Sequence, residues 1–341
     1  MSKIDFVIRW VDDNDPAWQK EKNKYLKMEE GRKENLLLVE TSNTRSEVRY
    51  RDWGLLKYWF RGIEKNAAWC NKIYFVSCGQ KPDWLNTDHP KLQMVNHKDF
   101  IPAKWLPTFS SRTIDLNLFR IKDLSEQFVL FDDDMFLVDK TTEHDFFING
   151  LPCDSMVFNV ITATARDVIN TNVFNNMAII NKHFQKNDFS KKDALYFLYN
   201  LKYGSYLYKN IVLAPWKNYL GFQDFHIPEG LLKSTFRELW NNETEILSNT
   251  CNHKFRKPSD ITQWLIRYWQ LVSKRFVPRS PKVGQYFQLS DNNQLIIDAI
   301  TKRKTKLLCI NDGEVTNFLE EKQKLKVAFE TIFPEKSCFE K

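Results

Sequence analysis

The sequence predicts an α/β fold with a mainly parallel sheet flanked by helices, and three observations support this prediction. Strand-like and helix-like stretches alternate along the first half of the chain, an order typical of parallel sheets with crossover helices. The run before Asp132, Phe128–Phe131, is apolar throughout, as expected for a strand covered on both faces. After about residue 165 the apolar residues recur mostly at helical spacing. We therefore expect an α/β half at 1–165 and a helix-rich half at 166–341, packed as one unit.

Each element of the first half follows from a local pattern. Runs of β-branched, aromatic and other apolar residues predict strands at Ile4–Val11, Ile73–Cys78, Leu92–Val95 and Phe128–Phe131. Amphipathic spacing predicts helices at Pro16–Glu29, Asp52–Lys65 and Ile114–Leu124. The run Ser155–Val160 would supply one further strand.

The second half contains five stretches with helical periodicity and one short apolar strand. The strand is expected at Lys306–Ile310, directly before Asn311 and Asp312. The helices are expected at Lys191–Asn200, Gly230–Trp240, Ser259–Val272, Gln294–Arg303 and Val315–Phe329.

Three consecutive carboxylates, Asp132, Asp133 and Asp134, interrupt the otherwise apolar run Phe128–Val138. A buried strand does not tolerate charge in its interior, so the triplet is expected at the tip of the strand. Ligands of open α/β sheets collect at that edge. Because adjacent carboxylates repel one another, a divalent cation is expected between them. The alternative is a solvated acidic turn that only ends the strand.

Composition excludes several classes of protein. A net charge of +7 without a concentrated basic stripe argues against a nucleic-acid binder. The six cysteines are scattered, which argues against a zinc ribbon or a disulfide framework. Neither GxGxxG nor GxxxxGK occurs, so any nucleotide is held without those loops. No apolar run is long enough to span a membrane, so we expect a cytoplasmic protein, with peripheral association at the inner membrane face at most.

Two polar turns are candidate binding sites in the first half. Asp12 and Asn14 follow the first strand and could grip a base or ribose, or they could be ordinary capping residues before Pro16. Ser110 and Ser111 precede the helix that leads to the acidic strand. They could contact a phosphate or simply cap that helix, and Arg112 could pair with a phosphate.

The second half contains candidates for a base, a clamp and a further ligand. His226 precedes what reads as a Pro-initiated helix, and a helix N-terminus would favour the neutral imidazole that a general base requires. Arg256 could clamp a transferring phosphoryl group, or it could form an exposed salt bridge. Asn311 and Asp312 could contact a metal or phosphate, or make a turn. Together these groups suit phosphoryl or glycosyl transfer from a nucleotide sugar.

The chain resembles the Stealth family of hexose-1-phosphate transferases in four sequence blocks. This family includes bacterial capsular polysaccharide phosphotransferases and the animal lysosomal-enzyme GlcNAc-1-phosphotransferase. The blocks occur in order and cover nearly the whole chain. They are carried by Ile4–Pro16; by Arg49–Asp52, Asn71–Asn86, Leu106–Ser111 and Phe131–Phe136; by His226–Pro228 with Phe255 and Arg256; and by Cys309–Asp312 with Phe333, Pro334, Phe339 and Glu340.

The resemblance implies transfer of a sugar 1-phosphate from a UDP-sugar to a hydroxyl of an acceptor glycan, in capsular or cell-surface polysaccharide synthesis. The product is a phosphodiester, UMP is released, and Mg²⁺ or Mn²⁺ is the expected cofactor. The acceptor would be a glycan or a lipid-linked oligosaccharide. The sheet would then be a nucleotide-sugar-binding sheet of the GT-A or Rossmann-like kind, and the helix-rich half would complete the active site.

The resemblance also implies roles for individual residues. Asp133, Asp134 and Asp312 would hold the metal, and His226, Arg256 and Asp133 would act in catalysis. The family commonly has asparagine at the position of Asp132, which is therefore not assigned as a metal ligand. The chain also has Asp52-Trp53-Gly54 where amide and acidic residues are frequent in the family. Substrate binding would fall to Asp12, Asn14, Arg49, Ser110, Ser111 and Asn311.

Two other functions fit the same residues. A metal-dependent glycosyltransferase would use the same acids but attack the anomeric carbon and release UDP. A non-catalytic nucleotide-sugar-binding subunit would need no base, and the presence of acids, His226 and Arg256 together argues against it.

Overall fold

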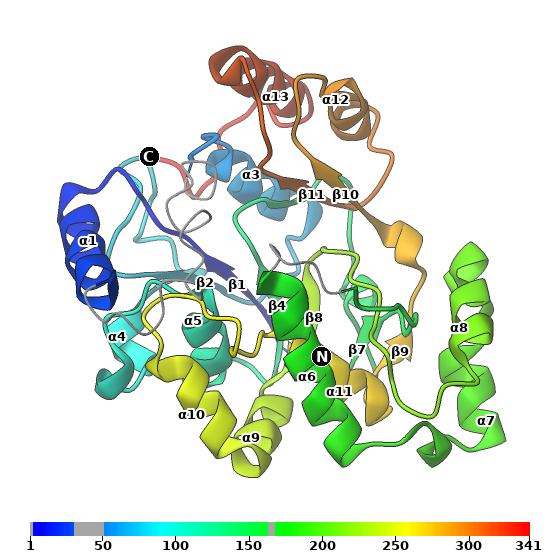
Figure 1. Ribbon diagram of the computed structural model, residues 1–341. Coiled ribbons are helices and arrows are strands. Elements are labelled where there is room, and N and C mark those ends of the chain that lie inside the picture. Colours follow the sequence, from blue (N-terminus) through cyan, green and yellow to red (C-terminus); the bar gives the residue numbers. More distant parts are fainter. Residues whose placement is uncertain (1–2, 31–50, 163–167) are drawn as a thin grey trace.

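The computed structural model describes residues 3–30, 51–162 and 168–341 (Figure 1). Its centre is a five-stranded sheet of order β3-β2-β1-β4-β8. Strands β1 to β4 run parallel, and β8 runs antiparallel to β4. The prediction of a mainly parallel α/β sheet is confirmed. The strands are β1 (Ile4–Arg9), β2 (Ile73–Ser77), β3 (Leu92–Asn96), β4 (Gln127–Phe131) and β8 (Glu229–Leu232).

Alternation along the strands supplies both faces of the central sheet with core residues. Phe6 and Ile8 of β1 join one hydrophobic cluster, while Val7 between them joins a second cluster. Successive side chains of a strand point to opposite faces, so the two clusters lie on the two sides of the sheet. All residues of β2 and of β4 are buried. This explains why their residues, apart from Ser77 and Gln127 at the strand ends, are apolar rather than alternately apolar and polar.

Helices cover the two faces of the central sheet (Figure 1). On one side lie α3, α12 and α13, and on the other lie α5, α9, α10 and α11. The helix bounds are α1 (Pro16–Glu30), α3 (Leu56–Asn66), α4 (His97–Phe100), α5 (Ser111–Asn117), α6 (Val168–His183), α7 (Lys191–Asp193), α8 (Leu207–Leu213), α9 (Lys233–Asn242), α10 (Thr244–Asn252), α11 (Trp264–Val272), α12 (Gln294–Thr301) and α13 (Phe318–Ile332).

Two small sheets complete the fold and tie the halves of the chain together. One has the order β10-β11-β5 and the other β6-β7-β9. Strand β5, from the first half, pairs with β11, and β8, from the second half, pairs with β4. The sheet β10-β11-β5 and the central sheet therefore each contain strands from both halves of the chain. The strands are β5 (Met135–Leu137), β6 (Phe147–Ile148), β7 (Leu151–Asp154), β9 (Val277–Pro278), β10 (Gly284–Gln288) and β11 (Leu307–Asn311).

The prediction of a strand at Ser155–Val160 is wrong. The strand in this region is β7, which forms a hairpin with β6 and ends at Asp154. The hairpin turn consists of Asn149 and Gly150, both with positive φ. An Asn-Gly pair is a strong hairpin signal because both residues accept the left-handed conformation. Beyond Asp154 the chain makes only one isolated bridge, between Phe158 and Phe222.

Several predicted helices begin or end elsewhere in the structure. The first residues of the predicted helix Gly230–Trp240 belong to β8, because the free edge of β4 offers them a hydrogen-bonding partner. The helix predicted at Ser259–Val272 begins only at Trp264, and the one at Ile114–Leu124 runs from Ser111 to Asn117. The stretch predicted as a helix at Lys191–Asn200 contains one short α turn and the π turn Ala194–Leu198. Strand β10 was not predicted.

Among the described residues, no helix has the length and apolar character needed to cross a membrane.

Candidate active site

The acidic triplet lies at the carboxyl end of β4, as the sequence predicts. Strand β4 ends at Phe131, and the three aspartates form the turn that leads into β5. The Met135 amide donates to the carbonyl of Asp132 at 3.2 Å, and the Ile310 amide donates to the carbonyl of Asp134 at 2.9 Å. The turn is therefore held between the central sheet and β11.

The triplet opens into a cavity of about 660 Å³, a size typical of sites for small-molecule ligands. Its walls come from both halves of the chain. Four arginines and several aromatic rings line it together with the acids. The charged and polar lining residues include Arg9, Arg51, Ser111, Arg112, Asp132, Asp133, Asp134, His226, Arg256, Asn311 and Asp312, and the rings include Trp10, Trp18, Phe109 and Trp264.

Asp133 and Asp134 have an electrostatic environment that suits a cation. Burial and the charge of Asp133 raise the pKa of Asp134 to about 6. Asp133 is open to the cavity, but the protein around its other sides desolvates the carboxyl and raises its pKa as well. The Oδ1 atom of Asp134 is buried and has no hydrogen-bond partner among the described residues. A divalent cation would pair this oxygen and remove the repulsion between the two carboxylates.

Asp132 points to a different partner. Its carboxylate accepts from Arg9 Nη2, and Arg9 Nη1 donates to Asp115 Oδ2 at 2.8 Å. Asp115 lies on α5 and is fully buried, and its burial, opposed by Arg9, raises the pKa of its carboxyl to about 6. Arg9 thus links the ends of β1 and β4 to α5. Sequence reasoning missed this arginine, whose only signal is a charge near the end of an apolar strand.

His226 lies in the loop before β8 and not before a helix, so the predicted helix N-terminus is absent. Its backbone has φ of +47°, a conformation uncommon outside glycine, which indicates that the surrounding contacts hold it in place. Its Nδ1 atom lies 3.3 Å from Asp224 Oδ2, and its amide donates to Asp224 Oδ1 at 2.8 Å. The ring also packs edge-on to Tyr286, with centroids 5.4 Å apart.

The electrostatics of His226 also differ from the prediction. Burial lowers the pKa of the imidazole, but the hydrogen bond and charge of Asp224 and the charge of Asp134 outweigh it and raise the pKa to about 8. The aspartates, rather than a helix dipole, therefore set its basicity. In the neutral ring, which predominates above a pH of about 8, Nδ1 donates to Asp224 and the other ring nitrogen can accept a proton.

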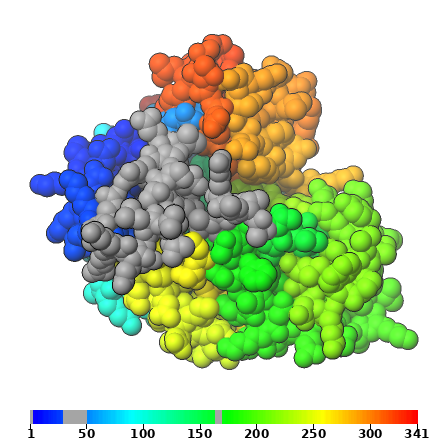
Figure 2. All heavy atoms as spheres, viewed as in Figure 1, coloured from blue at the N-terminus to red at the C-terminus, as the bar shows by residue number. Residues whose placement is uncertain are grey.

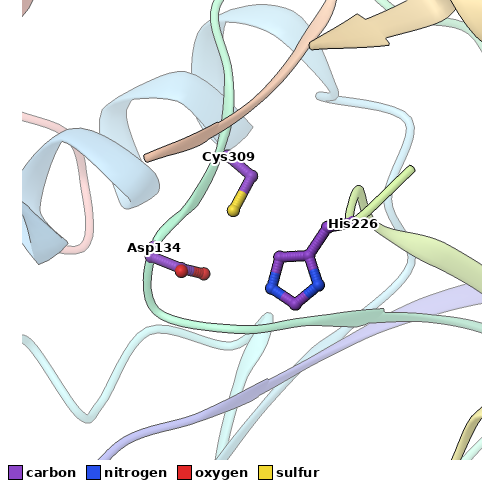
Figure 3. Close-up of side chains that lie close together, drawn as sticks. All are labelled: Asp134, His226 and Cys309. Atoms are coloured by element: carbon purple, nitrogen blue, oxygen red, sulfur yellow. The ribbon is translucent and has the colours of Figure 1, made fainter. Parts of the chain in front are cut away.

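Cys309 joins this group from β11. Ligand atoms of Asp134, His226 and Cys309 all lie within 4.8 Å of one another, as Figure 3 shows. The thiol is fully buried, and burial together with Asp134 raises its pKa, so it stays protonated. A neutral thiol is a poor ligand for Mg²⁺, whereas the carboxylate oxygens of Asp133 and Asp134 suit it. The residues present therefore fit a hard divalent cation on the carboxylate side.

The structure brings Arg256 and Ser111 together. Arg256 Nη2 donates to Ser111 Oγ at 2.7 Å, and both residues line the cavity. Ser110 differs, because its side chain is buried, makes no capping bond to α5 and is not among the residues that line the cavity. The prediction that Ser110 contacts substrate therefore has no geometric support.

A buried carboxylate holds the loop that carries Arg256. Asp260 is fully buried and accepts from Lys257 N at 2.7 Å, Arg112 Nη1 at 2.8 Å and His253 Nδ1 at 2.6 Å. Arg112 is itself buried and also donates to the Lys257 carbonyl. Arg112 therefore supports the loop structurally and does not supply a free clamp for phosphate.

We expect Asp260→Ala to lower the free energy of unfolding by about 3 kcal/mol, because it strands the buried charge of Arg112. Asp298→Ala is the matched control, since Asp298 pairs with Lys302 on the surface of α12 and exposed pairs contribute little. Urea unfolding followed by circular dichroism measures both. Equal, small losses for the two variants would contradict the structural role of Asp260.

Asn311 and Asp312 reach the same cavity at the end of β11. Arg51 holds the Asp312 carboxylate from two sides, with Nη2 at 2.5 Å from Oδ1 and Nε at 3.1 Å from Oδ2. Asn311 Nδ2 donates to the Tyr286 hydroxyl at 3.1 Å. A metal on Asp312 would compete with this guanidinium, so its role as a ligand stays a prediction.

The turn after β1 is built from its own hydrogen bonds. Asp12 Oδ1 accepts from the Asn14 amide at 3.0 Å, and Asp15 Oδ1 accepts from the Ala17 amide at the start of α1. Neither Asp12 nor Asn14 is among the described residues that line the cavity. Asp15 therefore caps α1, while Asp12 and Asn14 form the turn that precedes it. Arg49, also predicted to bind substrate, lies outside the described residues.

Comparison with known proteins identifies two conserved regions. Residues 2–30 match the model for Stealth protein CR1, conserved region 1, and residues 49–153 match that for Stealth protein CR2, conserved region 2. The acidic triplet lies within the second region.

Similarity to individual proteins extends over the full length. The chain is 44% identical to a capsular polysaccharide phosphotransferase, WcwK, of Streptococcus pneumoniae, covering 100% of this chain and 99% of the relative. It is 37% identical to the exopolysaccharide phosphotransferase cps2G of Lactiplantibacillus plantarum, over 99% and 96%. Among solved structures, the apo WbbM bifunctional glycosyltransferase matches 97% of this chain and 52% of its own, with 11% identity and a TM-score of 0.38, too weak a likeness to support an argument.

Proposed function

The chain belongs to the Stealth family of polysaccharide phosphotransferases, and we propose that it transfers a sugar 1-phosphate from a UDP-sugar to a hydroxyl of an acceptor glycan. The products are a phosphodiester and UMP, and the pathway is the synthesis of a capsular or other cell-surface polysaccharide. One observation carries the proposal. A single cavity brings together Asp133 and Asp134 on one strand tip, His226 beside them, and Arg256 from the second half of the chain.

His226 is the general base of this mechanism. The nitrogen not engaged by Asp224 takes the proton of the acceptor hydroxyl as its oxygen attacks the β-phosphorus of the donor. A bond forms between that oxygen and phosphorus, and the bond from phosphorus to the bridging oxygen breaks. The electron pair of the broken bond leaves with UMP. Asp224 orients the imidazole and stabilises the imidazolium that forms.

Arg256 stabilises charge on the oxygens of the transferring phosphoryl group, and Ser111 orients its guanidinium. Trp10, Trp18 and Phe109 provide rings on which a uracil base can stack. The central sheet then serves as the nucleotide-sugar platform of a GT-A or Rossmann-like site, with its ligand at the carboxyl edge of the strands.

Asp133 and Asp134 are the residues that would hold Mg²⁺ or Mn²⁺. When bound, the ion neutralises the diphosphate and the leaving UMP. Asp132 stays with Arg9 and shapes the strand end. Asp312 is the remaining candidate ligand, from β11.

A metal-dependent glycosyltransferase that releases UDP is the second candidate. It uses the same acids, but its acceptor attacks carbon rather than phosphorus. The full-length similarity to proteins named phosphotransferases favours phosphoryl transfer. The third candidate, a non-catalytic nucleotide-sugar-binding subunit, has no need of the Asp224–His226 pair.

The acceptor in this proposal is a growing glycan, either free or linked to lipid at the inner face of the cytoplasmic membrane. Incubation with UDP-sugars, Mg²⁺ and such acceptors tests the proposal through the nucleotide released. We expect UMP and a phosphodiester signal in the phosphorus NMR spectrum of the glycan. UDP with a glycosidic product would support the glycosyltransferase instead.

A further inference from the structure

The region between α7 and the loop before β8 exposes many large apolar side chains. Among the described residues, half of the exposed large apolar side chains lie between residues 195 and 216. Figure 2 shows this segment, in green to yellow-green, at the lower right edge of the molecule, and Figure 1 places α7 and α8 at the same edge. The exposed side chains are Leu195, Tyr196, Leu201, Tyr208, Ile211, Val212 and Trp216.

Helix α8 presents a defined apolar face outward. Tyr208, Ile211 and Val212 are spaced three and four residues apart, so they lie on one side of the helix. The opposite side is anchored by the buried Asn210, whose Nδ2 donates to the carbonyls of Met156 at 2.8 Å and Leu198 at 2.6 Å. The Phe158 amide in turn donates to Asn210 Oδ1 at 2.6 Å. The outward face is therefore a fixed surface rather than a frayed end.

Within this segment the charged side chains carry one sign. No aspartate or glutamate occurs between residues 194 and 223, whereas Lys202, Lys209 and Lys217 do. Tyrosine and tryptophan rings combine an apolar body with a polar tip, which suits the boundary between lipid and water. Lys217 is exposed, while Lys202 and Lys209 donate their Nζ atoms to protein oxygens and add positive charge close by; such charge beside apolar side chains attracts anionic headgroups. A second copy of the chain would instead bring lysines against lysines, which disfavours self-association through this face.

The surface is joined directly to the loop of the catalytic histidine. Lys209 Nζ donates to Gln223 Oε1 at 2.7 Å and to Asn159 Oδ1 at 3.0 Å. The Tyr206 ring packs edge-on against Phe225, with centroids 5.2 Å apart, and Phe225 directly precedes His226. The segment that carries the apolar face is therefore in direct contact with the loop that carries the base.

We propose that residues 195–216 form a membrane-docking surface that binds the headgroup region of an anionic bilayer. Docking there holds the His226 loop toward acceptors carried on lipid. The role of a lipid-linked acceptor depends on the proposed function, whereas the proposal that this surface binds a membrane does not.

Flotation of the full chain with vesicles tests the proposal. We expect it to float with phosphatidylcholine vesicles that contain phosphatidylglycerol, and to do so less with pure phosphatidylcholine or at high salt. The variant Ile211→Ser/Val212→Ser/Trp216→Ser should lose at least about tenfold in the vesicle-bound fraction. The matched control, Leu295→Ser/Leu319→Ser, removes exposed apolar side chains from α12 and α13 and should bind as the wild type does.

Three results would overturn the proposal. They are absence of wild-type binding to anionic vesicles, an equal bound fraction for the triple variant, and a dimer that the triple variant converts to a monomer in size-exclusion chromatography. The last result would assign the face to a second copy. Turnover with a water-soluble acceptor should be unchanged in the triple variant. Because flotation needs no catalysis, a failure of the proposed reaction leaves this test intact.

Discussion

Replacing His226 with alanine is expected to lower turnover by about 10³-fold while donor binding changes little, because a positioned general base contributes about 10²- to 10⁴-fold. The imidazole lies beside Asp134 in the cavity and is oriented by Asp224. Without it, the acceptor hydroxyl has no group beside the acids to take its proton. Steady-state turnover with saturating donor and acceptor, together with donor affinity from calorimetry, measures the two effects separately.

Two further variants make this test specific. His226→Gln keeps a polar side chain of similar reach but cannot act as a base, so it should be as impaired as His226→Ala. His144→Ala alters an exposed histidine that is not among the described residues lining the cavity, and it should retain wild-type turnover. Near-normal turnover in His226→Gln would show that the proton goes elsewhere.

Replacing Asp134 with asparagine is expected to lower metal-dependent turnover by about 10²- to 10³-fold, comparable to the loss of one electrostatic group that stabilises a transition state. Asp134 has a buried oxygen without a partner among the described residues, and its neighbour Asp133 repels it. The amide removes the charge that would hold a cation but keeps the shape of the side chain. Direct titration with Mn²⁺, followed by electron paramagnetic resonance, should show weaker binding.

The neighbouring acids provide the controls. Asp133→Asn should behave like Asp134→Asn, whereas Asp132→Asn should keep metal affinity because its carboxylate already pairs with Arg9. Asp139 lies beyond the other end of β5, so Asp139→Asn should leave metal affinity unchanged. If Asp132→Asn abolished Mn²⁺ binding while Asp134→Asn kept it, the assignment of ligands within the triplet would be reversed.

Local patterns were sufficient to predict the framework of the site. The uninterrupted apolar run before Asp132 fixed the position of a buried strand and of its tip, because charge is excluded from such a strand. The same reasoning placed the parallel strands at Ile4, Ile73, Leu92 and Phe128, close to where the structure has them. These features depend on residues adjacent in the sequence.

Contacts between distant residues could not be predicted in this way. Arg9 pairs with Asp115 and Asp132, more than 100 positions away, and Arg51 pairs with Asp312 across 261 positions. No local pattern encodes such pairs, although they decide which acids are available for a metal. Ser110 and Ser111 are a further example, since only the fold shows that one is buried and the other meets Arg256.

Tertiary pairing also overrode local propensity at one decisive place. Residues 230–232 read as the start of a helix but extend, together with Glu229, along the edge of β4 as β8. That change moves His226 from a helix N-terminus to a loop between Asp224 and Asp134, and it turns an expected neutral imidazole into one with a pKa of about 8. Asp224 stood two residues away in the sequence and was the available signal.

The fate of the β-phosphorus of the donor tests the central claim most directly. The measurement uses a UDP-sugar labelled with radioactive phosphorus at the β-position, incubated with the protein, Mg²⁺ and an acceptor glycan. If the acceptor hydroxyl attacks phosphorus, the label appears in the glycan and the released nucleotide is unlabelled UMP. Label retained in UDP, with an unlabelled glycan that has gained a sugar, would contradict sugar-phosphate transfer and identify a glycosyltransferase.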